Sequence, residues 1–110
     1  MKLQTALLDG GERLFSLAGR LDAASAPALQ AALEEALADG ETRLLVELSA
    51  IEFLDSTGLG ILVGGLKAAR KAGGDLRLVS PSPPVARLLR LTTLDRVFRV
   101  LESAGAGWDS

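Results

Sequence analysis

Short apolar runs alternate with longer segments of helical periodicity in this chain, and no other feature limits its fold as strongly. Residues 44–48, 76–79 and 97–101 are rich in leucine and valine, which is typical of buried strands. The segments between them repeat their apolar residues every three or four positions, as an amphipathic helix does. Alternation of this kind predicts an α/β fold with a mostly parallel sheet.

The N-terminal region departs from this alternation. Apolar runs at residues 3–8 and 13–18 flank Asp9-Gly10-Gly11, a sequence typical of a hairpin turn. The connection is too short for a crossover, so we expect these two strands to pair antiparallel. The residues Gly19 to Asp22 are then expected to form a loop.

Three helices are expected from the remaining segments. The first begins near Ser25, a residue type that caps helices, and ends at Gly40. The second follows Asp55-Ser56 and ends at Gly73-Gly74, where two glycines interrupt the periodic pattern. The third begins at Ser82, directly ahead of two prolines.

The length of 110 residues suits a single domain with one core. We therefore predict one domain over residues 1–110, with a small mixed, mostly parallel sheet and an N-terminal antiparallel hairpin. With only three helices, we expect them to cover mainly one face of the sheet. The C-terminal residues 102–110 are small and polar apart from Trp108, and we expect this tail to fray.

Composition excludes several classes of function. The chain has no cysteine and no histidine, so disulfides, thiol chemistry and Ser-His triads are excluded, and the usual zinc ligands are missing. A net charge of −2 argues against direct nucleic-acid binding. No window of about 18 residues is apolar enough to span a membrane. We expect a cytoplasmic protein that is not an enzyme and needs no cofactor or metal.

Polar and small residues are densest at Asp55-Ser56-Thr57-Gly58-Leu59-Gly60, where an apolar run meets the second helix. Ordinary capping of the helix is one interpretation. However, three oxygen-bearing side chains exceed what a cap needs, and each glycine costs about 1 kcal/mol in a helix relative to alanine. A close approach to the backbone would explain the glycines. The free N–H groups of a helix start also favour an anion, including a phosphate carried by Ser56.

Other chemistries fit this segment poorly. A phosphate-binding P-loop needs a lysine directly after its last glycine, and the next lysine is Lys67. The glycine spacing of a dinucleotide-binding loop is off by one residue. Ser56 lacks both a histidine base and the spacing of a nucleophile elbow. The carboxylates Asp22, Asp55 and Asp75 show no pairing that the sequence establishes.

The stretch Phe53 to Gly60, with Gly19-Arg20-Leu21-Asp22 upstream and Lys71-Ala72-Gly73-Gly74 downstream, resembles the anti-sigma-factor antagonists of the STAS family. The resemblance covers nearly the whole chain, from about Leu3 to Leu101. It rests chiefly on the Asp-Ser-Thr-Gly-Leu-Gly motif, which is quite specific, and less on the loop at Asp22.

The resemblance implies a bacterial partner switch. In this family the unmodified antagonist binds an anti-sigma factor that is also a serine kinase, and so releases a sigma factor. The kinase phosphorylates a serine at the start of the second helix, and a metal-dependent phosphatase of the PP2C type reverses the modification. The matching serine is Ser56, with Thr57 as a lesser candidate. The implied partner-binding residues are Asp22, Asp55, Ser56, Thr57, Gly58 and Leu59.

One position departs from the family pattern. Many relatives carry a glutamate where this chain has Arg20, which places a positive charge on the expected partner face and bears on which partner binds. Two alternatives stay open at this stage. One is a STAS module that senses a ligand or acts as a scaffold without a kinase. The other is a small nucleotide-binding or hydrolytic enzyme.

Overall fold

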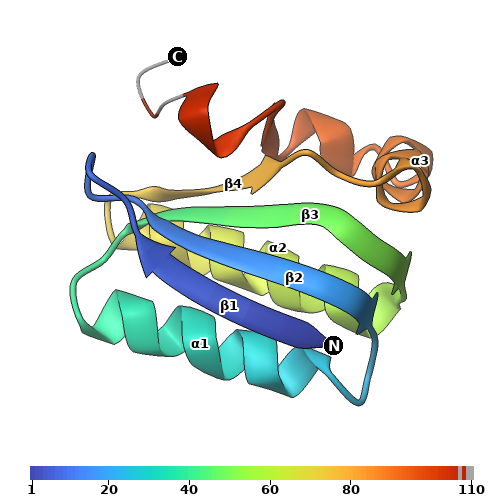
Figure 1. Cartoon of the computed structure of the whole chain (residues 1–110), viewed down its shortest axis with the longest axis horizontal. Helices are drawn as coiled ribbons and strands as arrows, with labels where there is room; N and C mark the ends of the chain where they lie inside the picture. The colour runs from blue at the N-terminus through green and yellow to red at the C-terminus, as the bar shows by residue number, and fades with distance from the viewer. Residues whose placement is uncertain (107, 109–110) are drawn as a thin grey trace.

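The computed structural model describes residues 1–106 and 108 and contains one five-stranded sheet in the order β1-β2-β3-β4-β5 (Figure 1). β1 and β2 pair antiparallel, and every later neighbouring pair is parallel. The strands are β1 (Lys2–Leu7), β2 (Arg13–Leu21), β3 (Arg43–Leu54), β4 (Asp75–Val79) and β5 (Arg99–Leu101). The helices are α1 (Ala26–Ala38), α2 (Ser56–Lys71) and α3 (Pro83–Leu91), with short 3-10 turns η1 (Leu94–Arg96) and η2 (Ala104–Ala106). The predicted fold class is confirmed.

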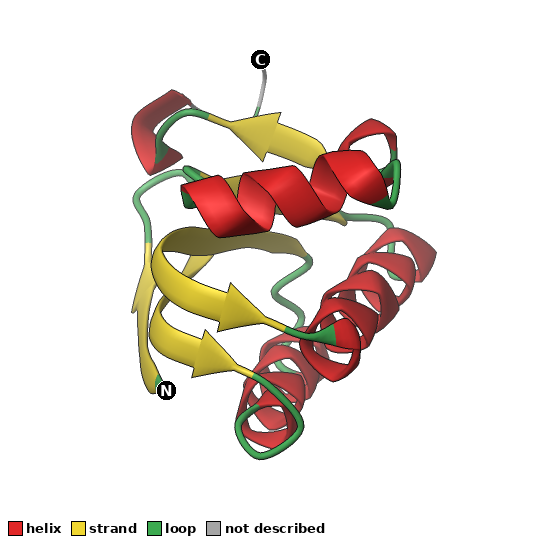
Figure 2. Cartoon of the chain, turned by 90° about the vertical axis from the view of Figure 1, so that its right-hand side faces the viewer, coloured by secondary structure: helices red, strands yellow, loops and turns green. Residues whose placement is uncertain are grey.

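The alternation of side chains along β3 explains the layers. Leu44, Val46 and Leu48 are buried in the main core together with the apolar faces of the helices. Leu45 points to the opposite face, where it packs with Val79 from β4 in a smaller cluster. α1 and α2 lie side by side against the sheet, and α3 lies across its upper part near β3 (Figure 2). The sheet therefore has one face covered by helices, as expected.

The segment Gly19–Leu21 is not a loop, contrary to our expectation. It forms the end of β2 and pairs with β3, with Arg20 opposite Phe53 and Leu21 opposite Leu54. β3 is a single strand of 12 residues. Its backbone therefore continues to pair with β2 at Gly19 and Arg20, where the β2 sequence is no longer apolar. The register shifts between Gly19 and Arg20, and Gly19 has a φ of +94°, which a side chain would disfavour.

Two of the serines predicted to cap helices occupy the N-cap positions without capping through their hydroxyls. Ser25 Oγ donates to the carbonyl of Arg20 at 2.7 Å, and Ser82 Oγ donates to the carbonyl of Ile51 at 2.6 Å. Neither makes a side-chain cap bond to its helix. The serine hydroxyls instead attach the starts of α1 and α3 to the ends of neighbouring strands.

The expected fraying of residues 102–110 stays a prediction, and residues 107, 109 and 110 lie outside the described residues. Within this segment the Trp108 ring stacks on the guanidinium of Arg77, whose Cζ lies 3.8 Å from the ring centroid. Trp108 also packs on the small cluster around Leu45 and Val79. Among the described helices, none has the length and apolar character needed to cross a membrane.

Candidate functional site

The strand-to-helix junction at Asp55 sets the geometry of the site. Asp55 is extended, with φ −102° and ψ −178°, and its carboxylate accepts the N–H of Gly58 at 2.9 Å. This bond satisfies one of the free donors of the first turn of α2. Asp55 is therefore the cap, and Ser56 is the first residue of the helix. The Ser56 and Thr57 side chains are exposed, and the cap bond of α2 is made by the Asp55 carboxylate.

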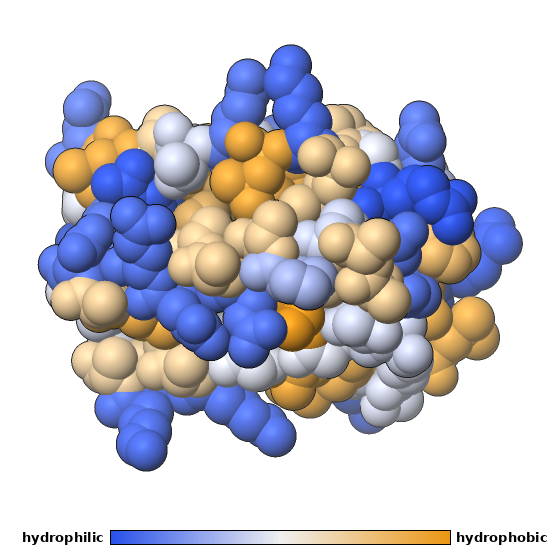
Figure 3. Space-filling view, turned by 90° about the horizontal axis from the view of Figure 1, so that it is seen from below, coloured by the Kyte–Doolittle hydropathy of each residue, from blue (hydrophilic) through white to orange (hydrophobic). Residues whose placement is uncertain are grey.

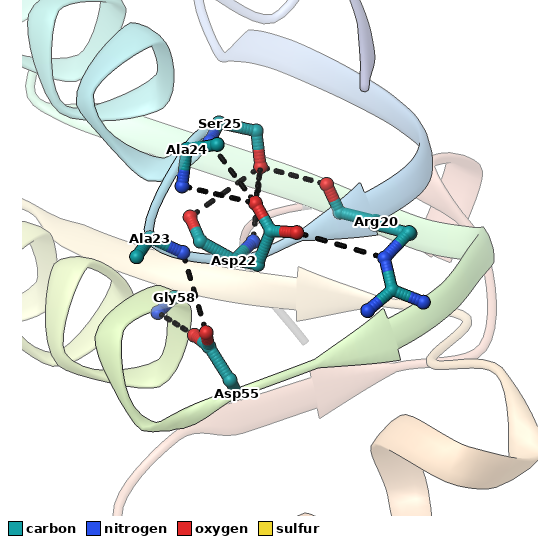
Figure 4. A network of polar contacts seen from close by, with 7 residues as sticks. All are labelled: Arg20, Asp22, Ala23, Ala24, Ser25, Asp55 and Gly58. Carbon is teal, nitrogen blue, oxygen red and sulfur yellow. Dashed lines mark hydrogen bonds and ion pairs between the residues drawn. The ribbon is translucent and has the colours of Figure 1, made fainter.

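The turn from Asp22 to Ser25 is held by its own side chains (Figure 4). Asp22 Oδ1 accepts the N–H groups of Ala24 at 3.1 Å and Ser25 at 3.2 Å. Ser25 Oγ accepts the N–H of Asp22 at 2.9 Å. Hydrogen bonds to the charged form, above all from the Ser25 backbone, lower the pKa of the Asp22 carboxyl from its ordinary value of 3.8. The carboxylate of Asp22 thus shapes the loop between β2 and α1.

Asp55 joins this turn to the start of α2. Its second carboxylate oxygen accepts the N–H of Ala23 at 3.2 Å (Figure 4). The backbone N–H of Asp55 donates to the carbonyl of Leu21 at 3.3 Å. β2 and β3 are parallel, so their C-terminal ends lie at the same edge of the sheet. The structure therefore brings the turn at Asp22 beside Asp55 and Ser56, although more than thirty residues separate them in sequence.

The expected close approach to the backbone is confirmed at one of the two motif glycines, Gly58, and not at the other, Gly60. Gly58 is buried, and a Cβ there would lie 2.5 Å from the carbonyl oxygen of Leu21 and 2.8 Å from Leu54 Cδ1. The close approach at Gly58 is therefore made by the chain's own β2. A Cβ at Gly60 would meet nothing within 4 Å. Leu59 is half-buried against the core, so Ser56 and Thr57 are the more accessible part of the motif.

Arg20 is anchored by two neighbours. Its guanidinium lies over the Phe53 ring at 4.1 Å from the centroid, a favourable cation–π geometry. Its Nε is 3.6 Å from Asp22 Oδ2. Phe53 was missed as a site residue in the sequence. Phe53 stands out because it is a large apolar side chain that is 39% exposed, two residues before Asp55. This exposure depends on which face of β3 points outward, and the sequence alone does not reveal that.

The chemistry available at this site is narrow. The hydroxyl of Ser56 is exposed, yet the chain has no histidine to act as a general base toward it. Within residues 1–106 and 108, no three carboxylates or other ligand side chains come together to hold a metal ion. The site can present a hydroxyl and a shaped surface at a helix start, where an added anion would be tolerated.

A family model for the STAS domain matches residues 6–106. The chain belongs to the STAS domain family. This STAS chain is 35% identical over 92 residues to the anti-sigma-B factor antagonist of Bacillus subtilis, covering 84% of each protein. It is 39% identical over 70 residues to a candidate anti-sigma factor antagonist of Thermotoga maritima, covering 64% of this chain and 62% of that protein. The chain thus spans less than two thirds of the length of this relative.

The structural comparison agrees with the family. The crystal structure of a Thermotoga maritima protein superposes with a TM-score of 0.88 at 28% identity, covering 94% of this chain and 89% of that one. The STAS fold therefore extends over nearly the whole chain and includes the β3–α2 junction that carries Ser56.

Proposed function

We propose that this STAS chain is an anti-sigma-factor antagonist in a partner-switching pathway. In this proposal its unphosphorylated form binds an anti-sigma factor that is also a serine kinase, and so releases a sigma factor. Phosphorylation of Ser56 abolishes the binding, and a PP2C-type phosphatase restores it. The chain itself acts without a catalytic site, and it works in the cytoplasm beside its partners. The Bacillus subtilis relative carries the name of an anti-sigma-B factor antagonist, which supports this assignment.

The exposed Ser56 hydroxyl at the first residue of α2 is the observation that carries the proposal. A kinase must reach the hydroxyl without unfolding its substrate, and Asp55 rather than Ser56 caps the helix. The hydroxyl can therefore be modified without loss of a structural bond. A phosphate would add about −1.5 to −2 charges at the positive end of the helix dipole, where the fold tolerates it.

The switch would then act on the interface. The hydrogen bond from the Ala23 N–H to the Asp55 carboxylate holds the turn at Asp22 beside Asp55 and Ser56. A partner seated on this surface would bury a bulky dianion next to two carboxylates, which costs both desolvation and repulsion. A loss of about 3–4 kcal/mol in binding free energy would weaken the affinity several-hundred-fold, which is sufficient for a switch.

The test is phosphorylation by the anti-sigma factor kinase from the same organism. Wild type, Ser56→Ala and Thr57→Ala are each incubated with the kinase and ATP, and the product is mapped by mass spectrometry. We expect one phosphate on Ser56 in wild type and in Thr57→Ala, and none in Ser56→Ala. A phosphate on Thr57, or equal labelling of Ser56→Ala, would contradict the assignment of Ser56.

A ligand-sensing or scaffold STAS module without a kinase is the second candidate. The observation that favours ligand sensing is a mainly apolar groove of about 210 Å³ between α1 and α2, lined by Leu33, Leu37 and Ile61 and open above Gly60 and Gly64. On the α1 side, hydrophobic and hydrophilic residues are interspersed over the surface (Figure 3). Absence of any phosphorylation together with saturable small-molecule binding would favour this candidate.

A further inference from the structure

The arginines of this chain fall into two groups. Arg13, Arg20, Arg43, Arg70 and Arg77 each lie within 4 Å of a carboxylate. Arg87, Arg90, Arg96 and Arg99 are exposed, and none of them forms an ion pair in the part of the chain that the structure describes. Residues 67–99 hold eight of the twelve basic residues and only two acidic ones. Positive charge is therefore concentrated toward α3 although the whole chain is acidic.

α3 places two of these cations beside an exposed leucine. Val85 and Leu89 face the core, so Arg87, Arg90 and Leu91, which are three and four positions apart, share the outer stripe of the helix. Leu91 is 75% exposed, the highest value among the large apolar side chains that face solvent. This stripe combines an exposed leucine with two arginines that form no ion pair within residues 1–106 and 108, and is therefore an amphipathic surface.

A groove of about 220 Å³ runs between this stripe and the end of β3. Its apolar walls are Phe53, Leu54, Pro84, Leu88 and Leu91, and Arg87 and Glu52 line it as well. The guanidinium of Arg20 lies on the Phe53 ring. Since an apolar cavity of about 150 Å³ holds a benzene molecule, this groove has room for one or two aliphatic side chains. We refer to it as the α3 groove.

We infer that the α3 groove binds an acidic amphipathic segment of a protein partner. Leucine-like side chains of that segment would fill the apolar groove, and its carboxylates would pair with Arg87 and Arg90, whose guanidinium groups suit carboxylates. Charge complementarity decides for this occupant, because Arg87 lines the apolar groove and Arg90 lies three positions further along α3, and neither forms an ion pair within the described residues. A long polyanion such as nucleic acid would also meet the remainder of the chain, which holds twelve acidic and four basic residues and makes the net charge of the whole chain −2. This inference is independent of Ser56.

The experiment measures the binding of a labelled helical peptide of glutamate and leucine to the full chain by fluorescence anisotropy at low salt. Two control peptides replace leucine with glutamine or glutamate with lysine. We expect the glutamate–leucine peptide to bind at least tenfold more tightly than either control. Equal binding of the glutamine control would show that the groove contributes nothing, and would overturn the inference.

Matched variants locate the binding. R87E/R90E and R96E/R99E change the net charge equally, so only local contact distinguishes them. We expect R87E/R90E to weaken the glutamate–leucine peptide at least tenfold and R96E/R99E less than threefold. L91S should remove the preference over the glutamine control. Equal effects of both double variants, or tighter binding of a DNA duplex or of vesicles with anionic lipid, would overturn the inference. Unchanged melting temperatures establish that the variants fold.

Discussion

The carboxylate of Asp55 holds two backbone N–H groups that belong to different segments. One is that of Gly58 in the first turn of α2, and the other is that of Ala23 in the turn after β2. The same side chain therefore starts the helix and fixes the neighbouring turn beside it. Ser56, directly after Asp55, makes no such contribution, and the switch that we propose requires this separation between the residue that caps the helix and the residue that is modified.

Replacement of Asp55 should therefore destabilise the fold more than replacement of Ser56. Asp55→Ala removes the cap and the bond to Ala23, and we expect a loss of about 1–2 kcal/mol in the free energy of unfolding. Ser56→Ala should stay within about 0.5 kcal/mol of wild type. Urea denaturation of both variants measures the difference. A larger loss for Ser56→Ala would show that the serine hydroxyl supports the helix after all.

Asp22 gives the fold a dependence on acidic pH. Its pKa is lowered in the folded state, chiefly by the N–H of Ser25, from an ordinary value of 3.8. The unfolded chain then binds the proton more readily, so the contribution of Asp22 is present above about pH 3.8 and is lost as pH falls through the lower folded value. Asp22→Asn should reduce the loss of stability between pH 5 and pH 3, measured by urea denaturation. An unchanged pH profile would contradict this.

At the scale of elements, the contact between α2 and β2 depends on a residue without a side chain. Gly58 packs on the carbonyl of Leu21, and a Cβ there would come within 2.5 Å of that oxygen. Gly60, two residues later, faces open space. The two glycines are equivalent in the sequence, and only the packing of α2 on β2 distinguishes them.

Gly58→Ala and Gly60→Ala should therefore have opposite effects on stability. The first forces α2 away from β2, and overpacking of this kind costs about 1–3 kcal/mol. The second replaces a poor helix former without a clash and should stabilise by up to about 1 kcal/mol. Thermal unfolding of both variants provides the test. A stabilising Gly58→Ala would mean that the junction relaxes easily and that the glycine serves another purpose.

The same elements show what the sequence could predict. The strand–helix alternation and the position of Ser56 at the start of α2 follow from local periodicity and capping, and both agree with the structure. The pairing of Arg20 with Phe53 does not, because it depends on β3 continuing to Leu54 beside a polar end of β2. The hydroxyls of Ser25 and Ser82 bond to strand carbonyls, and such tertiary bonds leave no local pattern.

At the scale of the whole molecule, the site and the fold are separable. The core lies between the sheet and the helices, whereas Ser56 and the turn at Asp22 lie at the edge where β2 and β3 end. The α3 groove also lies at the end of β3, and its other wall is formed by α3. A change in charge at Ser56 should thus alter what binds at this edge without reaching the core.

The most direct test of the proposed switch at Ser56 compares the affinities of phosphorylated and unphosphorylated protein for the anti-sigma factor from the same organism, together with both melting temperatures. We expect an affinity several-hundred-fold lower after phosphorylation of Ser56, corresponding to about 3–4 kcal/mol, and melting temperatures within a few degrees of each other. Ser56→Asp should also bind weakly, although aspartate carries only part of the charge of a phosphate. Its helix should stay intact, because aspartate is a favourable residue at a helix start. Equal affinity of the two forms, or a weakened affinity explained by unfolding, would contradict the switch at Ser56.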